Sequence, residues 1–269
     1  METTSSVAPP APSEPSFLAR HQFAIIRLFS LTGLLPIGGY LCVHLLTNAT
    51  VINGAAAYQE NVDRIHSLGK VLWAVEWLFI FLPLMFHAVV GWMIISGAVP
   101  NTNAYPYASN MRYTLQRGTG IVAFFFILFH LLHMHKVIGS PVAWLGGAAF
   151  DPHHATSSAA AALQAALWLQ IFYAVGILAS VYHLANGLWT FGIRWGLWTS
   201  PAAQRRASYV SLAFGLALGA VGLSSLGAMA DADIQEAKQV ELRMEYARKI
   251  TTGELPLPTA AAENKPTEK

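Results

Sequence analysis

The sequence is poor in charge and in cysteine, and both shortages narrow the classes of protein to which it can belong. Only 11% of its 269 residues are charged and 54% are hydrophobic, with a mean hydropathy of +0.44. Soluble domains carry about a quarter charged residues, so this composition indicates an integral membrane protein. The single cysteine, Cys42, excludes a disulfide framework, a thiolate zinc site and an iron–sulfur cluster held by this chain alone. The net charge of +2 gives no indication of nucleic-acid binding.

Long apolar runs take up most of the chain. A helix needs about 20 residues to cross a bilayer, and five segments meet that length: 24–48, 71–98, 117–138, 163–193 and 206–229. We therefore predict an all-α membrane protein with five transmembrane helices, in which residues 24–229 form one domain and the first four helices form a bundle. Pro36 and Pro83 lie inside predicted helices and are expected to kink them.

The two tails differ from this domain in composition. Residues 1–23 are rich in Ser and Pro and lack the basic start and apolar run of a signal peptide, so we predict a disordered cytoplasmic extension. Residues 230–269 carry the most strongly charged stretch, for which we predict a solvated helix followed by disorder.

Lysine and arginine near the segment ends predict the orientation, because basic residues concentrate on the cytoplasmic side of a membrane. With the N-terminus inside, the outward-facing basic residues before the C-terminal tail are Arg64, Lys70 and Lys136. The inner side then holds a larger set of arginines, at positions 20, 27, 112, 117, 194, 205 and 206. We therefore predict a multi-pass protein with its N-terminus inside and its C-terminus outside.

One histidine lies in each of the first four apolar segments: His44, His87, His130 and His183. An imidazole inside a bilayer is costly and persists where it faces a bundle interior and has a partner. Paired neutral imidazoles in a dry helical bundle suit haem iron, so we expect two bis-histidine haem sites. A lone buried histidine is more often a hydrogen-bonded core residue, but four on successive membrane helices disfavour that explanation.

A helix rises about 1.5 Å per residue, so the direction of each helix and the position of its histidine give the depth of that histidine in the membrane. These depths pair the histidines. His44 and His130 fall toward the outer side of helices that run outward. His87 and His183 each fall about 15 Å from the inner ends of helices that run inward. Helices 1 and 3 lie diagonally across an up-down bundle, as do helices 2 and 4, so each pair can bridge a planar macrocycle. His133 is an alternative on the third helix, although a polar role near the outer interface explains it more simply.

Other residues near these histidines have roles that the sequence leaves open. Gly91 and Gly187 each follow a histidine by four residues, on the same helix face, where a missing side chain would let a flat ring approach. A small-residue helix contact is the alternative. Arg27, Arg117 and Arg194 lie near inner helix ends, where they could donate to haem propionates or simply reach the interface.

Glu76 is the one acid well inside a predicted membrane segment. It lies about three turns outward from His87, near the level of the outer histidine pair. An acid at this depth could exchange the proton that accompanies quinone chemistry. A helix-end carboxylate that reaches the outer water is an equal alternative.

Four stretches of the sequence resemble the five-helix, di-haem cytochrome b subunit of succinate:quinone oxidoreductases, the type common in menaquinone-using bacteria. They cover the four histidine-bearing helices in order: RLFSLTGLLPIGGYLCVHLLTN (27–48), EWLFIFLPLMFHAVVG (76–91), LQRGTGIVAFFFILFH (115–130) and FYAVGILASVYHLANGLWTFGIRWG (172–196). The resemblance fades in both tails and in the loop 139–161.

The resemblance implies specific roles for these residues. It makes His44 and His130 the axial ligands of an outer haem b, makes His87 and His183 those of an inner haem b, and selects His130 over His133. It also covers further residues, for which it implies contacts with quinone or haem propionates: Glu76, Arg27, Ser30 and Arg117.

The same resemblance implies a function in respiratory complex II and the tricarboxylic acid cycle. The chain would anchor a flavoprotein and an iron–sulfur subunit to the cytoplasmic face of a bacterial inner membrane. Electrons would pass from the iron–sulfur subunit through the inner and then the outer haem to a quinone, expected to be menaquinone. The chain has no nucleotide fingerprint, so succinate would be oxidised elsewhere in the complex, which could itself form an oligomer.

Other functions fit parts of the pattern. Another quinone-linked b cytochrome, such as the membrane subunit of a hydrogenase or formate dehydrogenase, would have its ligands on fewer helices. A proton-coupled transporter would need acids or broken helices at the midplane, where this chain has Glu76 alone. A haem-free structural anchor is disfavoured by the four intramembrane histidines.

Overall fold

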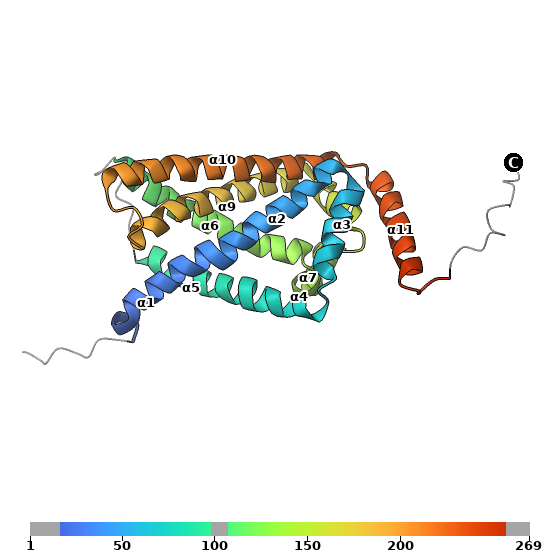
Figure 1. Ribbon diagram of the computed structural model, residues 1–269, viewed down its shortest axis with the longest axis horizontal. Helices are drawn as coiled ribbons and strands as arrows, with labels where there is room; N and C mark the ends of the chain where they lie inside the picture. The colour runs from blue at the N-terminus through green and yellow to red at the C-terminus, as the bar shows by residue number, and fades with distance from the viewer. Residues whose placement is uncertain (1–16, 98–106, 257–269) are drawn as a thin grey trace, which may run out of the picture.

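Helices make up most of the structure, a computed structural model that describes residues 17–97 and 107–256, with no strand among them. Five spans are long and apolar enough to cross a membrane (Figure 1). Two of them are interrupted helices: α1 (Phe17–Thr32), η1 (Gly33–Gly38) and α2 (Gly39–Ala49) form one, and α4 (Lys70–Val75), η3 (Glu76–Phe81) and α5 (Leu82–Ser96) form the other. Three are single helices: α6 (Ala108–Met134), α9 (Leu167–Arg194) and α10 (Pro201–Asp231).

Shorter helices gather at one end of the bundle, on the right of Figure 1, which we call the α3 end. The opposite end, where α1 begins, is the α1 end. The shorter helices are η2 (Thr50–Asn53), α3 (Ala55–His66), α7 (Lys136–Gly139), η4 (Ser140–Leu145), α8 (Ala155–Gln164) and α11 (Ile234–Thr251).

Proline accounts for the interruption of both broken spans. Pro36 lies within η1, and Pro83 is one of the first residues of α5, directly after η3. Proline has no backbone N–H and crowds the carbonyl four residues earlier, so the preceding turn widens into a π-helix. The segments η1 and η3 contact each other across the bundle. The prolines expected to kink their helices therefore each accompany a π-helical turn.

Two predicted helix ends were wrong. The fourth segment, predicted over 163–193, begins only at Leu167, because Ala166 is extended (φ −160°, ψ 143°) and separates α9 from α8. The third, predicted over 117–138, ends at Met134. His135 leaves the helical conformation there, and its Nδ1 accepts the backbone N–H of Ile138 at 3.3 Å to begin α7.

Other boundaries lie further out than predicted. The first span begins at Phe17, so residues 17–23, predicted as disordered, continue α1. The fifth begins at Pro201 rather than at 206, because Ser200 Oγ accepts the backbone N–H of Ala203 at 3.2 Å and proline suits the first helical turn. The predictions for residues 1–16 and 257–269 lie outside the described residues.

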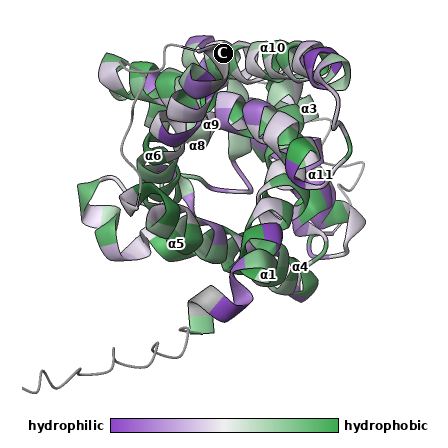
Figure 2. Ribbon diagram, turned by 90° about the vertical axis from the view of Figure 1, so that its left-hand side faces the viewer, coloured by the Kyte–Doolittle hydropathy of each residue, from purple (hydrophilic) through white to green (hydrophobic). Residues whose placement is uncertain are grey.

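Apolar side chains cover the outside of the bundle. In Figure 2, hydrophobic residues predominate on α5 and α6 around the periphery. Only 11% of the most apolar window of each of the first three spans is buried within the protein, as expected for helices with a lipid-facing side. Close helix contacts use small residues instead. At Gly176 of α9 the ring of Phe126 lies where a Cβ would be, which brings α6 and α9 together.

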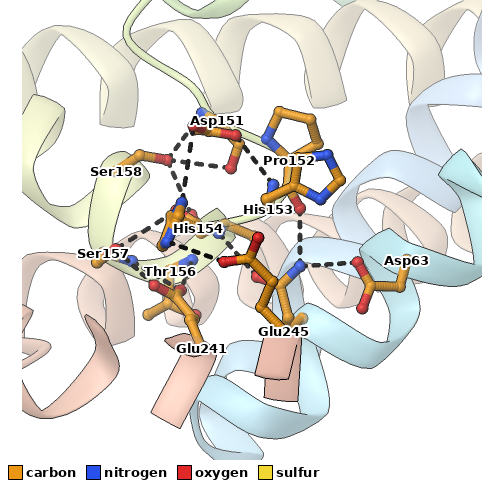
Figure 3. A network of polar contacts seen from close by, with 12 residues as sticks. Asp63, Asp151, Pro152, His153, His154, Thr156, Ser157, Ser158, Glu241 and Glu245 are labelled. Atoms are coloured by element: carbon orange, nitrogen blue, oxygen red, sulfur yellow. Dashed lines mark hydrogen bonds and ion pairs between the residues drawn. The ribbon is translucent and has the colours of Figure 1, made fainter. Parts of the chain in front are cut away.

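A buried polar network joins α3, α8 and α11 at the α3 end (Figure 3). Glu241 of α11 is fully buried and accepts the backbone N–H groups of Thr156 (2.6 Å) and Ser157 (3.0 Å) in the first turn of α8. Gln59 of α3 accepts the N–H of Ala155 at 2.9 Å. The helix predicted to be solvated therefore packs on the bundle through this network, which we call the α8 cap.

Candidate functional site

The four membrane histidines come together in two pairs inside the bundle. The imidazoles of His44 on α2 and His130 on α6 have ring centroids 5.7 Å apart, and their planes meet at 75°. Those of His87 on α5 and His183 on α9 have centroids 6.2 Å apart, with planes at 89°. These are the two pairs that helix depth predicted, and each joins one interrupted span to one uninterrupted helix.

The spacing of both pairs suits two imidazoles on one metal ion. An imidazole nitrogen binds a transition metal at about 2 Å, which separates the centroids of two opposed rings by roughly 6.5 Å. The observed centroid distances of 5.7 and 6.2 Å lie within about 1 Å of this value. Among the described residues no group of three or more His, Cys, Asp or Glu side chains could hold a metal ion. Two protein ligands per metal is the number that a six-coordinate, bis-histidine haem uses.

Backbone carbonyls orient the imidazoles of the His87–His183 pair. Nδ1–H of His87 donates to the carbonyl of Phe29 on α1 at 3.0 Å. Nδ1–H of His183 donates to the carbonyl of Gln116 on α6, also at 3.0 Å. The side-chain amide nitrogen of Gln116 also lies 3.2 Å from Nδ1 of His183. A carbonyl only accepts, so the two carbonyl contacts favour the neutral tautomer with its proton on Nδ1 and a free electron pair on Nε2. This is the arrangement that metal-binding histidines use.

A chain of hydrogen-bonded polar side chains lies next to His183, and the sequence analysis did not predict it. The amide of Gln116 donates to the backbone carbonyl of His183 at 3.1 Å and accepts from the buried Asn186 at 2.8 Å. Asn186 accepts from Nε of Arg112 at 2.9 Å, and Arg112 also donates to Ser208 of α10 at 2.8 Å. The available signal in the sequence was Asn186, an amide inside an apolar segment three residues after His183.

Side chains rather than carbonyls contact the His44–His130 pair. Asn48 lies 3.1 Å from Nε2 of His44, and its own carbonyl oxygen accepts the hydroxyl of the buried Tyr58 at 2.9 Å. The hydroxyl of the buried Tyr173 lies 3.4 Å from Nδ1 of His130 and 2.8 Å from Nδ1 of His133. His133, the alternative on the third helix, is thus a partner of Tyr173.

Two arginines have donors that the protein leaves unused. Within the part of the chain that the structure describes, Nε of Arg27 and Nε of Arg117 are buried and lack a hydrogen-bond partner. The Arg27 guanidinium lies over the rings of Phe23 and Trp195, at 4.5 and 4.9 Å, and that of Arg117 lies 4.2 Å over Tyr113. Buried, unpaired cationic donors fit an absent acid group, as haem propionates would supply.

The two glycines predicted to face a ring have no steric need to be glycine in the protein alone. A Cβ at Gly91 would lie 3.5 Å from the ring of Phe29, and one at Gly187 would lie 3.8 Å from the amide of Gln116. Both are ordinary contact distances. An alanine would therefore fit at either position, and the approach of a macrocycle to these glycines stays a prediction. Ser30, which the resemblance also covered, is partly buried on α1.

Glu76 is the first residue of the π-helical η3 and is partly buried. It directly follows α4 (Lys70–Val75), which comes after α3 along the chain at the α3 end (Figure 1). Glu76 therefore lies toward the α3 end, on the side of the His44–His130 pair.

Five apolar spans around two intramembrane imidazole pairs define the class of multi-pass membrane cytochromes. No model of a protein family matches the chain. A curated relative, the succinate dehydrogenase cytochrome b558 subunit of Bacillus subtilis, is 36% identical over 207 residues, which cover 76% of this chain and 96% of the relative. The chain belongs to the succinate dehydrogenase cytochrome b558 subunit family. It is accordingly a multi-pass membrane subunit of a redox complex with other subunits.

Proposed function

We propose that the chain is the di-haem membrane anchor of a succinate:quinone oxidoreductase, linking an iron–sulfur subunit to a quinone. The observation that carries this proposal is that four histidines from four different spans form two imidazole pairs. The ring centroids are 5.7 Å apart in one pair and 6.2 Å apart in the other. The likeness to a succinate dehydrogenase subunit supports the identity of the complex.

The residues in and around the two imidazole pairs suit two haems b. His44 and His130 would hold the haem nearer the α3 end, and His87 and His183 the other. The unpaired Nε donors of Arg27 and Arg117 suit propionates, with Ser30 nearby on α1. Gly91 and Gly187, one turn after His87 and His183, would let the edge of a macrocycle approach the backbone. When bound, haem b would supply one-electron transfer between the iron–sulfur subunit and the quinone.

The imidazoles themselves decide the kind of chemistry. Two imidazoles on opposite sides of one iron leave no open position for oxygen, so these pairs favour electron transfer over gas binding. The carbonyl partners of His87 and His183 hold their rings in one tautomer, which keeps Nε2 available as a ligand.

Glu76 is our candidate for the proton exchange at the quinone, which we expect to be menaquinone. It lies toward the α3 end and is the one carboxylate well inside a predicted membrane segment. A carboxylate there can take or give the proton that quinone reduction requires.

The arginine-rich α1 end faces the cytoplasm of a bacterium in this proposal. Arg20, Arg27 and Arg194 line a shallow pocket there, and basic residues mark the inner side of a membrane. The flavoprotein and iron–sulfur subunits would dock on this face of the inner membrane.

Haem content of the purified complex tests the proposal. A pyridine haemochrome assay should find two haems b per chain, and His87→Ala should reduce the number to one by removing one of four ligands. His66→Ala, outside the spans, is the control and should keep both. A well-assembled wild-type complex without haem would overturn the proposal.

A further inference from the structure

The residue whose carbonyl accepts a hydrogen bond from His87 is followed, one helical turn later, by a glycine that contacts the same imidazole. Phe29 provides the carbonyl at 3.0 Å, and Gly33 begins the π-helical η1 four residues further on. A Cβ added to Gly33 would fall 2.9 Å from Nδ1 of His87 and, without relaxation, still closer to its Cε1. Both contacts are shorter than those that real Cβ atoms make.

The second ligand of this pair has the same arrangement on a different helix. Gln116 of α6 provides the carbonyl at 3.0 Å from Nδ1 of His183, and Gly120 follows four residues later. A Cβ added to Gly120 would fall 2.9 Å from Cε1 of His183 and 3.2 Å from its Nδ1. The sequence reasoning singled out neither Gly33 nor Gly120.

Helix geometry explains why the carbonyl and the glycine occur together. In a helix the carbonyl of one residue points toward the N–H of the residue one turn later, so that residue's Cβ stands beside the carbonyl. A glycine there leaves the second lone pair of the carbonyl open to a side chain from another helix. The imidazole occupies the place of the missing Cβ and donates to the carbonyl through Nδ1–H.

We infer that Phe29–Gly33 and Gln116–Gly120 are two carbonyl–glycine cradles that position the imidazoles of His87 and His183 for metal binding. Each glycine admits a ring to its carbonyl, the carbonyl retains the proton on Nδ1, and Nε2 stays free to bind iron. Gly33 and Gly120 are thus positioning residues, because they act through the histidines. The inference rests on the proposed haem ligation by this pair.

The test compares two sets of glycine-to-alanine variants. One set substitutes the cradle glycines, and the other substitutes glycines beside which a Cβ would meet no other atom. Gly33→Ala and Gly120→Ala each place a Cβ too close to an imidazole ring, that of His87 or of His183. Gly39→Ala and Gly118→Ala are the matched controls, since nothing lies within 4 Å of a Cβ added at either position. Alanine favours a helix over glycine, so helix propensity alone would not weaken any of the four variants.

Each variant is purified in the whole complex, and its haem content, ferric low-spin EPR spectrum and midpoint potentials are measured. The g anisotropy of a low-spin haem depends on the angle between its two imidazole planes. We expect the cradle variants to lose one of two haems, or to keep it with altered g values and a raised midpoint potential, while the other haem is unchanged. The controls should keep two haems with wild-type signals.

Three results would overturn the inference. Cradle variants with two haems, wild-type g values and wild-type potentials would show that the glycines position nothing. Loss of both haems in both cradle variants would mark them as folding positions. A wild type without haem would instead defeat the proposed function, and this inference with it.

Discussion

The two imidazole pairs are supported by different chemical groups. Backbone carbonyls hold His87 and His183, whereas the hydroxyl of Tyr173 and the amide of Asn48 contact His130 and His44. A carbonyl is present whatever the side chain, but a hydroxyl is removed by one substitution. Single substitutions should therefore tune the His44–His130 site directly, whereas the carbonyl partners of the His87–His183 site are reached through the glycines that admit its rings.

Tyr173→Phe tests this difference at the His44–His130 site. The substitution removes the hydroxyl near His130 and His133 but keeps the ring that packs against Phe126. Loss of a hydrogen bond to a ligand imidazole makes it less electron-donating. We expect two haems per chain, with a raised midpoint potential for one and no change in the other, measured by mediated redox titration. Tyr246→Phe, on the exposed surface of α11, is the control. Two unchanged potentials would contradict the prediction.

Depth along a helix was predictable from the sequence, and rotation about the helix was not. A fixed rise per residue was enough to pair His44 with His130 and His87 with His183. The partners of those rings depend on how each helix is rotated and on what crosses it. The Gln116 carbonyl and the glycine one turn later look like any other helical residues until α9 is packed against them.

At the scale of elements, each imidazole pair takes one histidine from an interrupted span and one from an uninterrupted helix. His44 follows η1 and His87 follows η3, while His130 and His183 lie on the uninterrupted α6 and α9. A π-helical turn rotates the residues after it relative to those before it. The direction of His44 and His87 therefore depends on Pro36 and Pro83, which accompany those turns.

The α8 cap yields a prediction about stability. Glu241→Ala leaves the N–H groups of Thr156 and Ser157 buried without an acceptor, which should cost about 1–3 kcal/mol for each unsatisfied group. We expect a lower apparent melting temperature of the detergent-solubilised complex. Glu60→Ala removes an exposed ion pair with Arg64 and should change stability by less than about 1 kcal/mol. Equal melting temperatures for the two variants would show that the cap does not stabilise the bundle.

Helix ends were less predictable than helix cores, for reasons seen at two positions. The alanine-rich stretch before Leu167 favours a helix at every residue, yet Ala166 is extended. Gln164, two residues earlier, donates from its amide to the carbonyls of Met229 and Ala232 at the end of α10. His135 ends α6 by capping α7 with its own ring. Contacts between distant segments, which hydropathy does not encode, decided the first case.

For the whole molecule, an odd number of spans separates the two termini. The five spans direct the start of α1 and the end of α10 to opposite faces of a membrane. Protease added to spheroplasts should remove a C-terminal epitope tag and leave an N-terminal tag intact, and inverted vesicles should show the reverse. A tag on the iron–sulfur subunit, protected in spheroplasts, is the control. Cleavage of the N-terminal tag in spheroplasts would contradict the orientation predicted from the arginines.

The straight helices α6 and α9 each contribute to both imidazole pairs. On α6, Gly120 admits the ring of His183 and His130 is itself a member of the other pair. On α9, Tyr173 contacts His130 and His183 is a ligand candidate. The two residues have the same spacing on both helices, about 15 Å along the axis. These two helices thus set the distance along the bundle axis between the two imidazole pairs. An insertion or deletion between these positions would change that distance, across which an electron would pass in the proposed function.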